Sequence, residues 1–164
     1  MFKRLLVPLD GSRFGLRALS YATEVARRFE AEIILLQVIK PTTPVISQGP
    51  QGEASPVGSE IALKSAAEED ARNAVRAKRY LSSKVRGIIS QGMAGSYSVV
   101  VGDPSQSIIS FSHKERIDLI VMSTHGKSGL KRAIMGSVAD SVIRESGKPV
   151  LVIRPPSRSK KRSR

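Results

Sequence analysis

The sequence predicts an α/β fold, a single-domain, doubly wound parallel sheet of five strands with helices on both faces. Short, nearly continuous apolar runs such as IILLQVI (33–39) are typical of strands that are covered on both sides. Longer segments with apolar residues at helical spacing alternate with these runs. Right-handed crossovers between successive parallel strands then wind the chain into one sheet. A chain of 164 residues is long enough for one core of this kind.

The first strand is predicted over 2–9, and Pro8 marks its end because proline cannot donate a hydrogen bond to a neighbouring strand. Asp10-Gly11-Ser12 predicts a turn and the N-cap of a helix that runs through Phe29. The second strand is predicted over 33–39. The apolar face of the intervening helix is expected to hold Leu16, Leu19, Ala22 or Thr23, Ala26 and Phe29.

The stretch 40–59 holds four prolines and three glycines, so it is expected to form no regular element. We interpret it as a mobile loop, with a lid over a ligand as the alternative. From Glu60 to about Ser90 small and apolar residues recur every three or four positions, which predicts a long helix. The third strand follows over 97–101.

Asp103, Pro104 and Gln106 predict the start of a helix through Lys114, with Asp103 as N-cap, proline at the first position and a capping box. A fourth strand is predicted over 117–122. The chain is expected to end with a helix over 137–145, a fifth strand over 150–153 and a disordered basic tail over 155–164.

The segment between the fourth strand and the last helix holds several glycines and suits an anion. Glycine lets the backbone approach closely, and the first turn of the following helix offers unpaired N–H groups at the positive end of its dipole. A Walker A motif is excluded, since it needs glycine five positions before Gly126, where Val121 stands. A G-x-G-x-x-G fingerprint does not occur either.

The run STHGKSGLKRAIMGSVADSVI followed by GKPVLVIR resembles the signature of the universal stress proteins. The ATP-binding members carry glycine, two residues, glycine, nine residues, then glycine followed by serine or threonine. Here Gly126 is the second glycine, Gly136-Ser137 closes the pattern, and Ser123 stands at the first position. The resemblance covers nearly the whole chain from Phe2 to Arg154 and implies the strand order 3-2-1-4-5.

The resemblance also implies a site for ATP, or for AMP or ADP, with Mg²⁺ or Mn²⁺ held by the phosphates. Asp10 would contact ribose and adenine, and the backbone of Val38 would meet the adenine ring. The Gly126 and Gly136 amides and the Ser137 hydroxyl would take the phosphates. The predicted nucleotide-binding residues are Pro8, Leu9, Asp10, Val38, Met122, Ser123, His125, Gly126, Lys127, Gly129, Gly136, Ser137 and Val138.

These residues favour binding over turnover, because no second carboxylate joins Asp10 to hold a metal or orient water. We therefore expect a nucleotide-dependent regulatory protein of the stress response, with no catalytic residue and no metal held by the protein alone. One alternative is a slow ATP hydrolase that uses His125. Another is a nucleotide-free relative that acts through contacts with protein or nucleic acid.

The composition and charge of the chain limit which partners and which cellular compartment we expect. The formal net charge is +13, of which the tail 155–164 carries five charges, so contact of the tail with nucleic acid is an alternative that we do not favour over a solvated end. The chain has no cysteine, no run of about 18 apolar residues and no N-terminal signal peptide pattern, so we expect a cytoplasmic protein with no membrane span. The strand 150–153 would form an exposed apolar edge, which predicts a homodimer joined through it.

Overall fold

A computed structural model of the chain describes residues 1–44, 56–124 and 136–154. It confirms the predicted fold, because all five strands pair in parallel in the order β3-β2-β1-β4-β5. The strands are β1 (Arg4–Pro8), β2 (Glu32–Ile39), β3 (Gly95–Val101), β4 (Leu119–Ser123) and β5 (Val150–Ile153). The helices are α1 (Gly15–Phe29), α2 (Pro56–Ile89), α3 (Pro104–Lys114) and α4 (Ser137–Glu145).

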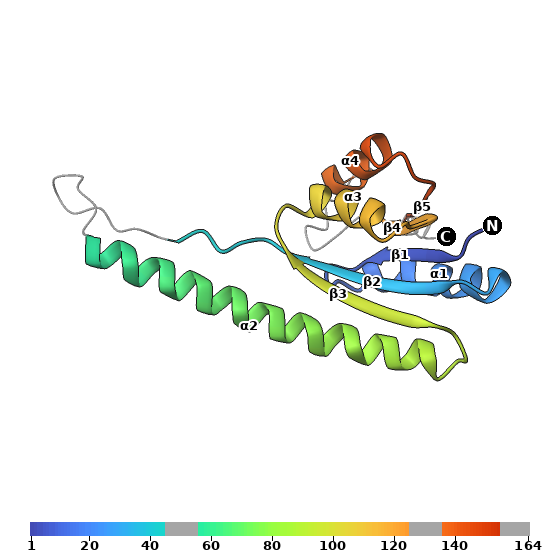
Figure 1. Ribbon diagram of the computed structural model, residues 1–164, viewed down its shortest axis with the longest axis horizontal. Coiled ribbons are helices and arrows are strands. Elements are labelled where there is room, and N and C mark those ends of the chain that lie inside the picture. Colours follow the sequence, from blue (N-terminus) through green and yellow to red (C-terminus); the bar gives the residue numbers. More distant parts are fainter. Residues whose placement is uncertain (45–55, 125–135, 155–164) are drawn as a thin grey trace, which may run out of the picture.

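The sheet separates two hydrophobic clusters, and each lies under one pair of helices (Figure 1). On one face, Leu5 and Val7 of β1 pack with α1 and α2. On the other face, Leu6 packs with α3 and α4. Successive side chains of a strand point to opposite sides, and these three are completely buried. The central strands therefore need apolar residues at every position.

The predicted start of the first helix was wrong. Asp10 Oδ1 accepts a hydrogen bond from the Ser12 amide at 3.0 Å, and Ser12 Oγ accepts one from the Gly15 amide at 3.1 Å. These bonds hold 10–14 as a turn, so α1 begins at Gly15. Its buried face is Gly15, Ala18, Ala22 and Ala26, whereas Phe29 is 39% exposed.

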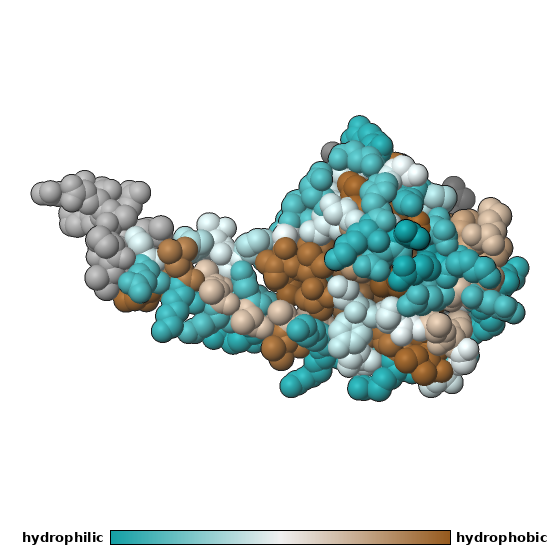
Figure 2. All heavy atoms as spheres, in the orientation of Figure 1, coloured by the Kyte–Doolittle hydropathy of each residue, from teal (hydrophilic) through white to brown (hydrophobic). Residues whose placement is uncertain are grey.

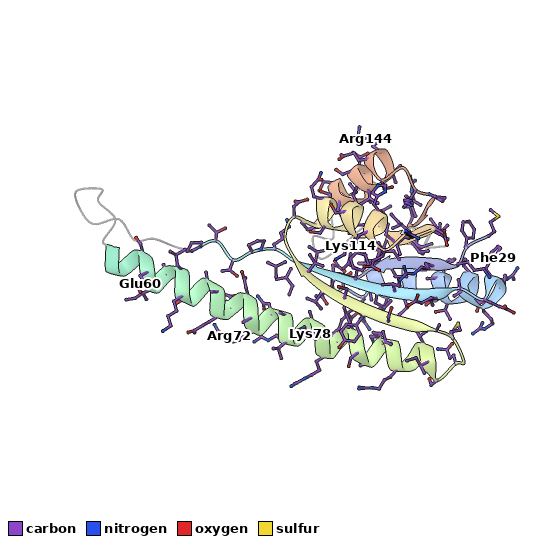
Figure 3. All side chains as sticks on the ribbon, viewed as in Figure 1. Phe29, Glu60, Arg72, Lys78, Lys114 and Arg144 are labelled. Atoms are coloured by element: carbon purple, nitrogen blue, oxygen red, sulfur yellow. The ribbon has the colours of Figure 1, made fainter. Side chains whose placement is uncertain are left out.

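Helix α2 begins at Pro56, so the expectation that 40–59 forms no regular element was wrong for the last part of that stretch. Proline suits the first turn of a helix, where its missing N–H costs no bond. Figure 1 shows that the amino-terminal half of α2 projects well beyond the sheet, and Figure 3 places Glu60 near its far end. The Thr42 amide and hydroxyl both donate to Asp70 Oδ1, at 2.9 and 2.6 Å, and tie the chain after β2 to this projecting part.

The start of α3 agrees with the prediction in part. Asp103 Oδ1 accepts from the Gln106 amide at 3.0 Å, and this bond, followed by one from the Ser105 hydroxyl, lowers the pKa of Asp103. The second half of the predicted capping box, a bond from the Asp103 amide to the Gln106 side chain, does not form, and Gln106 Nε2 donates to Glu145 Oε2 of α4 at 3.4 Å. The capping residue therefore fixes α3, and the glutamine joins α3 to α4.

Asp118 fixes the amino ends of β1 and β4 relative to each other. Its Oδ2 accepts from the backbone amides of Lys3 at 2.7 Å and Arg4 at 2.9 Å. These two bonds lower the pKa of the Asp118 carboxyl, with the Lys3 amide as the larger cause. The pairing of the two strands is thus anchored at the end opposite to the one where ligands bind in such sheets.

Candidate functional site

The winding direction of the sheet reverses between β1 and β4. These strands pair directly, with Leu5 opposite Leu119 and Leu6 opposite Ile120. After β1 the chain turns into α1 on one face, and after β4 it leads to α4 on the other face. Four positions beyond the second pair lie Asp10 and Thr124. A crevice at such a reversal is where open parallel sheets hold their ligands.

A cleft of about 620 Å³ opens at this end of the sheet, within the size range of small-molecule sites. Its lining comes from the turn after β1, the end of β2, the middle of α2 and the first residue of α3. The lining residues are Asp10, Gly11, Gln37, Val38, Ile39, Lys40, Asn73, Arg76, Ala77, Tyr80 and Pro104. A groove of about 680 Å³ also runs along α2, but residues of α2 alone line it and it does not reach the strand ends.

Asp10 and Val38, which the sequence predicted as one site, both line the cleft, although Asp10 follows β1 and Val38 lies near the end of β2. The Asp10 side chain is half-buried, and its Oδ1 is held by the Ser12 amide. This bond orients the carboxylate toward the cleft. Figure 2 shows apolar side chains gathered where the projecting part of α2 leaves the body of the protein. The cleft therefore places one carboxylate, held by a backbone amide, among both apolar and polar side chains.

Two further cleft residues, Gln37 and Tyr80, were missed by the sequence analysis. Gln37 Oε1 and the Tyr80 hydroxyl are buried and have no hydrogen-bond partner among the described residues. Burial, followed by the negative charge of Asp10, raises the pKa of Tyr80, so its hydroxyl keeps its proton at neutral pH. Gln37 gave a signal in the sequence, as the polar residue inside an apolar strand. Tyr80 gave none, because an aromatic residue on a helix usually belongs to the core.

At the neighbouring strand end, the amide of Gly136 donates to the Thr124 carbonyl at 3.1 Å. The expectation that this amide binds phosphate stays a prediction, and in this structure a protein carbonyl occupies the amide. Glycine is needed for a steric reason, because a Cβ atom here would lie 2.7 Å from the same oxygen. The groups that remain suited to an anion are the exposed Ser137 and the first-turn amides of α4 at Ser137 and Val138.

The other predicted residues differ in what they can offer. Leu9 and Met122 are 3% and 5% exposed and belong to opposite core clusters, so only their backbones can face a ligand. Pro8 ends β1 beside Leu36, and Ser123 ends β4 and is half-buried. The remaining predicted residues lie outside the described part of the chain, namely His125, Gly126, Lys127 and Gly129.

A sequence model of the universal stress protein family matches residues 1–154. The chain belongs to this family. Universal stress protein MJ0531 of Methanocaldococcus jannaschii is 31% identical over 158 residues, which cover 96% of this chain and 85% of that protein.

Solved structures of universal stress proteins share the fold of this chain. The structure of protein MJ0577 from a structural genomics study covers 95% of this chain and 98% of its own, with 28% identity and a TM-score of 0.78. A universal stress protein in complex with cAMP has 20% identity and a TM-score of 0.57, and covers 93% and 97% of the two chains. An Arabidopsis thaliana family member with AMP bound has 17% identity and a TM-score of 0.60, and covers 94% and 93%.

Charges in the cleft of this universal stress protein are mixed. Lys40 and Arg76 lie in the same lining as Asp10 and suit a ligand that carries an anionic group as well as hydroxyls. Within 1–44, 56–124 and 136–154, no cluster of three or more histidine, aspartate or glutamate side chains has the arrangement of a metal site. None of the helices in these ranges is long and apolar enough to span a bilayer.

Proposed function

We propose that this universal stress protein binds an adenine nucleotide, ATP, ADP or AMP, in the crevice between β1 and β4, and acts as a nucleotide-dependent regulatory dimer. The observation that carries the proposal is that Asp10 and Val38 line one cleft at the ends of β1 and β2, and that β1 pairs directly with β4. The AMP and cAMP complexes of two other family members support the class of ligand. The cytoplasm is the compartment that we expect from the sequence.

In this proposal Asp10 accepts hydrogen bonds from the ribose hydroxyls. The half-buried Val38 offers its backbone and an apolar surface to the base. The phosphates lie toward Ser137 and the first turn of α4, where backbone N–H groups and the helix dipole favour negative charge. A divalent cation, Mg²⁺ or Mn²⁺, would be held by the phosphates.

The residues around the cleft fit binding better than hydrolysis. Phosphoryl transfer needs a group that orients the attacking water and charges that stabilise the transferred phosphoryl group. Asp10 is the carboxylate in the cleft lining, and its Oδ1 already accepts from the Ser12 amide. We therefore propose a switch that responds to nucleotide occupancy, and slow hydrolysis is the competing function that a phosphate-release assay detects.

The dimer is proposed through β5, which lies at an edge of the sheet beside β4. The Ile120 amide donates to the Pro149 carbonyl, and the Thr124 amide donates to the Ile153 carbonyl. The backbone N–H and C=O groups of every second residue of β5 therefore point toward β4. The backbone groups of Val150 and Val152 then point outward, where a second copy can pair with them. The side chains of β5 from Val150 to Val152 are half-buried, as expected for an apolar edge strand that a second copy can cover.

Isothermal titration calorimetry with ATP, ADP and AMP tests the binding site. The unaltered protein should bind at least one of them below millimolar concentration, and Asp10→Ala should weaken that binding about tenfold or more. Glu24→Ala is the matched control, since Glu24 is an exposed carboxylate of α1 that pairs with Arg27 away from the cleft. Absence of binding at millimolar nucleotide, or equal affinity after Asp10→Ala, would overturn the proposal.

A further inference from the structure

Two residues that line one cleft each carry a buried polar atom without a hydrogen-bond partner among the described residues. Gln37 Oε1 and the Tyr80 hydroxyl come from β2 and α2, and neither makes a hydrogen bond within the described residues. Burying such an atom unpaired destabilises a protein, so these atoms are rarely left without a partner. Two of them in the wall of one cleft indicate that a ligand supplies the missing bonds.

The alternation of β2 explains why the two side chains share a wall. Ile33 and Leu35 pack against α1 and α2, and Gln37 is the next residue on that face. Tyr80 reaches the same place from α2, where its ring packs against the same core cluster. Lys84 lies one turn further along α2, with its Nζ 5.5 Å from the centre of the Tyr80 ring. Backbone pairing and core packing thus fix both groups before a ligand arrives.

The chemistry of the two groups fits the edge of a base. Adenine presents an amino donor beside a ring acceptor, and a glutamine amide offers the complementary acceptor and donor. The buried atom of Gln37 is its acceptor oxygen, which calls for a donor. A 6-oxo base such as hypoxanthine or guanine has a carbonyl acceptor in place of the amino group. The raised pKa of Tyr80 keeps its hydroxyl protonated and able to donate to a ring nitrogen.

We propose that Gln37 and Tyr80 read the base of the bound nucleotide, with Gln37 selecting the 6-amino group of adenine and Tyr80 strengthening the binding of any purine. This inference rests on the proposed function and adds the source of its base preference. Gln37 is then the residue that sets specificity, and Tyr80 adds affinity that does not depend on the group at position 6 of the base.

Affinities for ATP and inosine triphosphate test the proposal, because the two ligands differ in the amino or carbonyl group of the base. The unaltered protein should prefer ATP about tenfold or more. Gln37→Leu should bring the ratio of the two affinities close to one, mainly by weakening ATP. Tyr80→Phe should weaken both ligands by a similar factor of about five. Gln91→Leu and Tyr97→Phe are matched controls, because both residues are exposed and lie outside the cleft lining.

Thermal melting of the free protein gives a second readout. Neither polar atom bonds to a described protein group, so Gln37→Leu and Tyr80→Phe should melt at or above the temperature of the unaltered protein. A clear fall in Tm for either variant would assign its polar group to the fold and overturn its role as a reader.

The outcomes separate this inference from the function on which it rests. If the unaltered protein binds neither triphosphate, the nucleotide site itself is wrong and the inference falls with it. If it binds ATP and Asp10→Ala weakens that binding, but Gln37→Leu keeps the preference over inosine triphosphate, the site stands and only the base readers are wrong.

Discussion

Replacing Gly136 by alanine tests the contact that joins α4 to the end of β4. The added Cβ would lie 2.7 Å from the Thr124 carbonyl oxygen, whereas carbon and oxygen in contact lie about 3.3 Å apart or more. The backbone must therefore separate by about 0.6 Å to accept it. That movement stretches the 3.1 Å bond from the Gly136 amide to the same oxygen beyond hydrogen-bond range.

The expected loss combines two terms. A lost hydrogen bond costs about 1 kcal/mol and local overpacking costs at least about 1 kcal/mol, which gives roughly 2 kcal/mol. In a chain of this size 1 kcal/mol shifts Tm by about 2 to 4 °C, so Gly136→Ala should melt about 4 to 8 °C lower. Differential scanning calorimetry measures the shift.

Gly87→Ala is the matched control, because the same methyl group is added where nothing lies within 4 Å of it. Gly87 lies in the last turn of α2, and alanine is favoured over glycine in a helix by up to about 1 kcal/mol, so this variant should melt slightly higher. The two substitutions should thus shift Tm in opposite directions. A Gly136→Ala protein that melts at or above the unaltered protein would refute the close approach of Gly136 to Thr124.

Three further predictions concern the dimer, the acid range and α2. Val152→Pro should turn the proposed dimer into a monomer in light scattering, because the Val152 amide faces away from β4. Leu151→Pro should instead disrupt the pairing of β5 with β4. A Val152→Pro protein that stays dimeric would exclude this interface. Asp118→Asn should lower Tm at pH 7. Because the native pKa of Asp118 is depressed, its charge stabilises the fold above about pH 4, and this stabilisation is lost as the pH falls through the native pKa. Melting curves of the two proteins that stay apart in acid would contradict this. Thr42→Val should lower the free energy of unfolding by about 1 kcal/mol and speed amide exchange at positions 42 and 43, which lie between two prolines, with β1 as the unchanged reference. Unchanged exchange at these two positions would show that the bond to Asp70 does not hold this segment.

The sheet could be predicted because its physics is local. A strand covered on both faces needs apolar residues at every position, and the runs around Leu6, Leu35 and Ile120 satisfy that rule. The fold class and the family follow from such runs and from the glycine pattern. The start of α1 could not be located in this way, because Asp10 and Ser12 are good capping residues that here stabilise a turn three residues earlier.

The site residues at the ends of strands could be predicted from the sequence, whereas those that α2 contributes could not. Asp10 follows β1, and Val38 was assigned from the family resemblance. Tyr80 enters the cleft because α2 crosses the end of β2, which is a long-range contact that no local pattern encodes. Gly136 is the reverse case, because the glycine pattern singles it out but does not reveal that a Cβ atom there would lie against the Thr124 carbonyl oxygen.

The length of α2 has a mechanical consequence. Its 34 residues span about 50 Å, whereas the seven residues of neighbouring β3 span about 23 Å. Apart from Ala66, its buried residues lie from Ala77 onward, in the half that lies against the sheet. One half of the helix is thus anchored on the sheet and the other half projects from it. A partner that displaces the end near Glu60 would act on Tyr80 through about 30 Å of continuous helix.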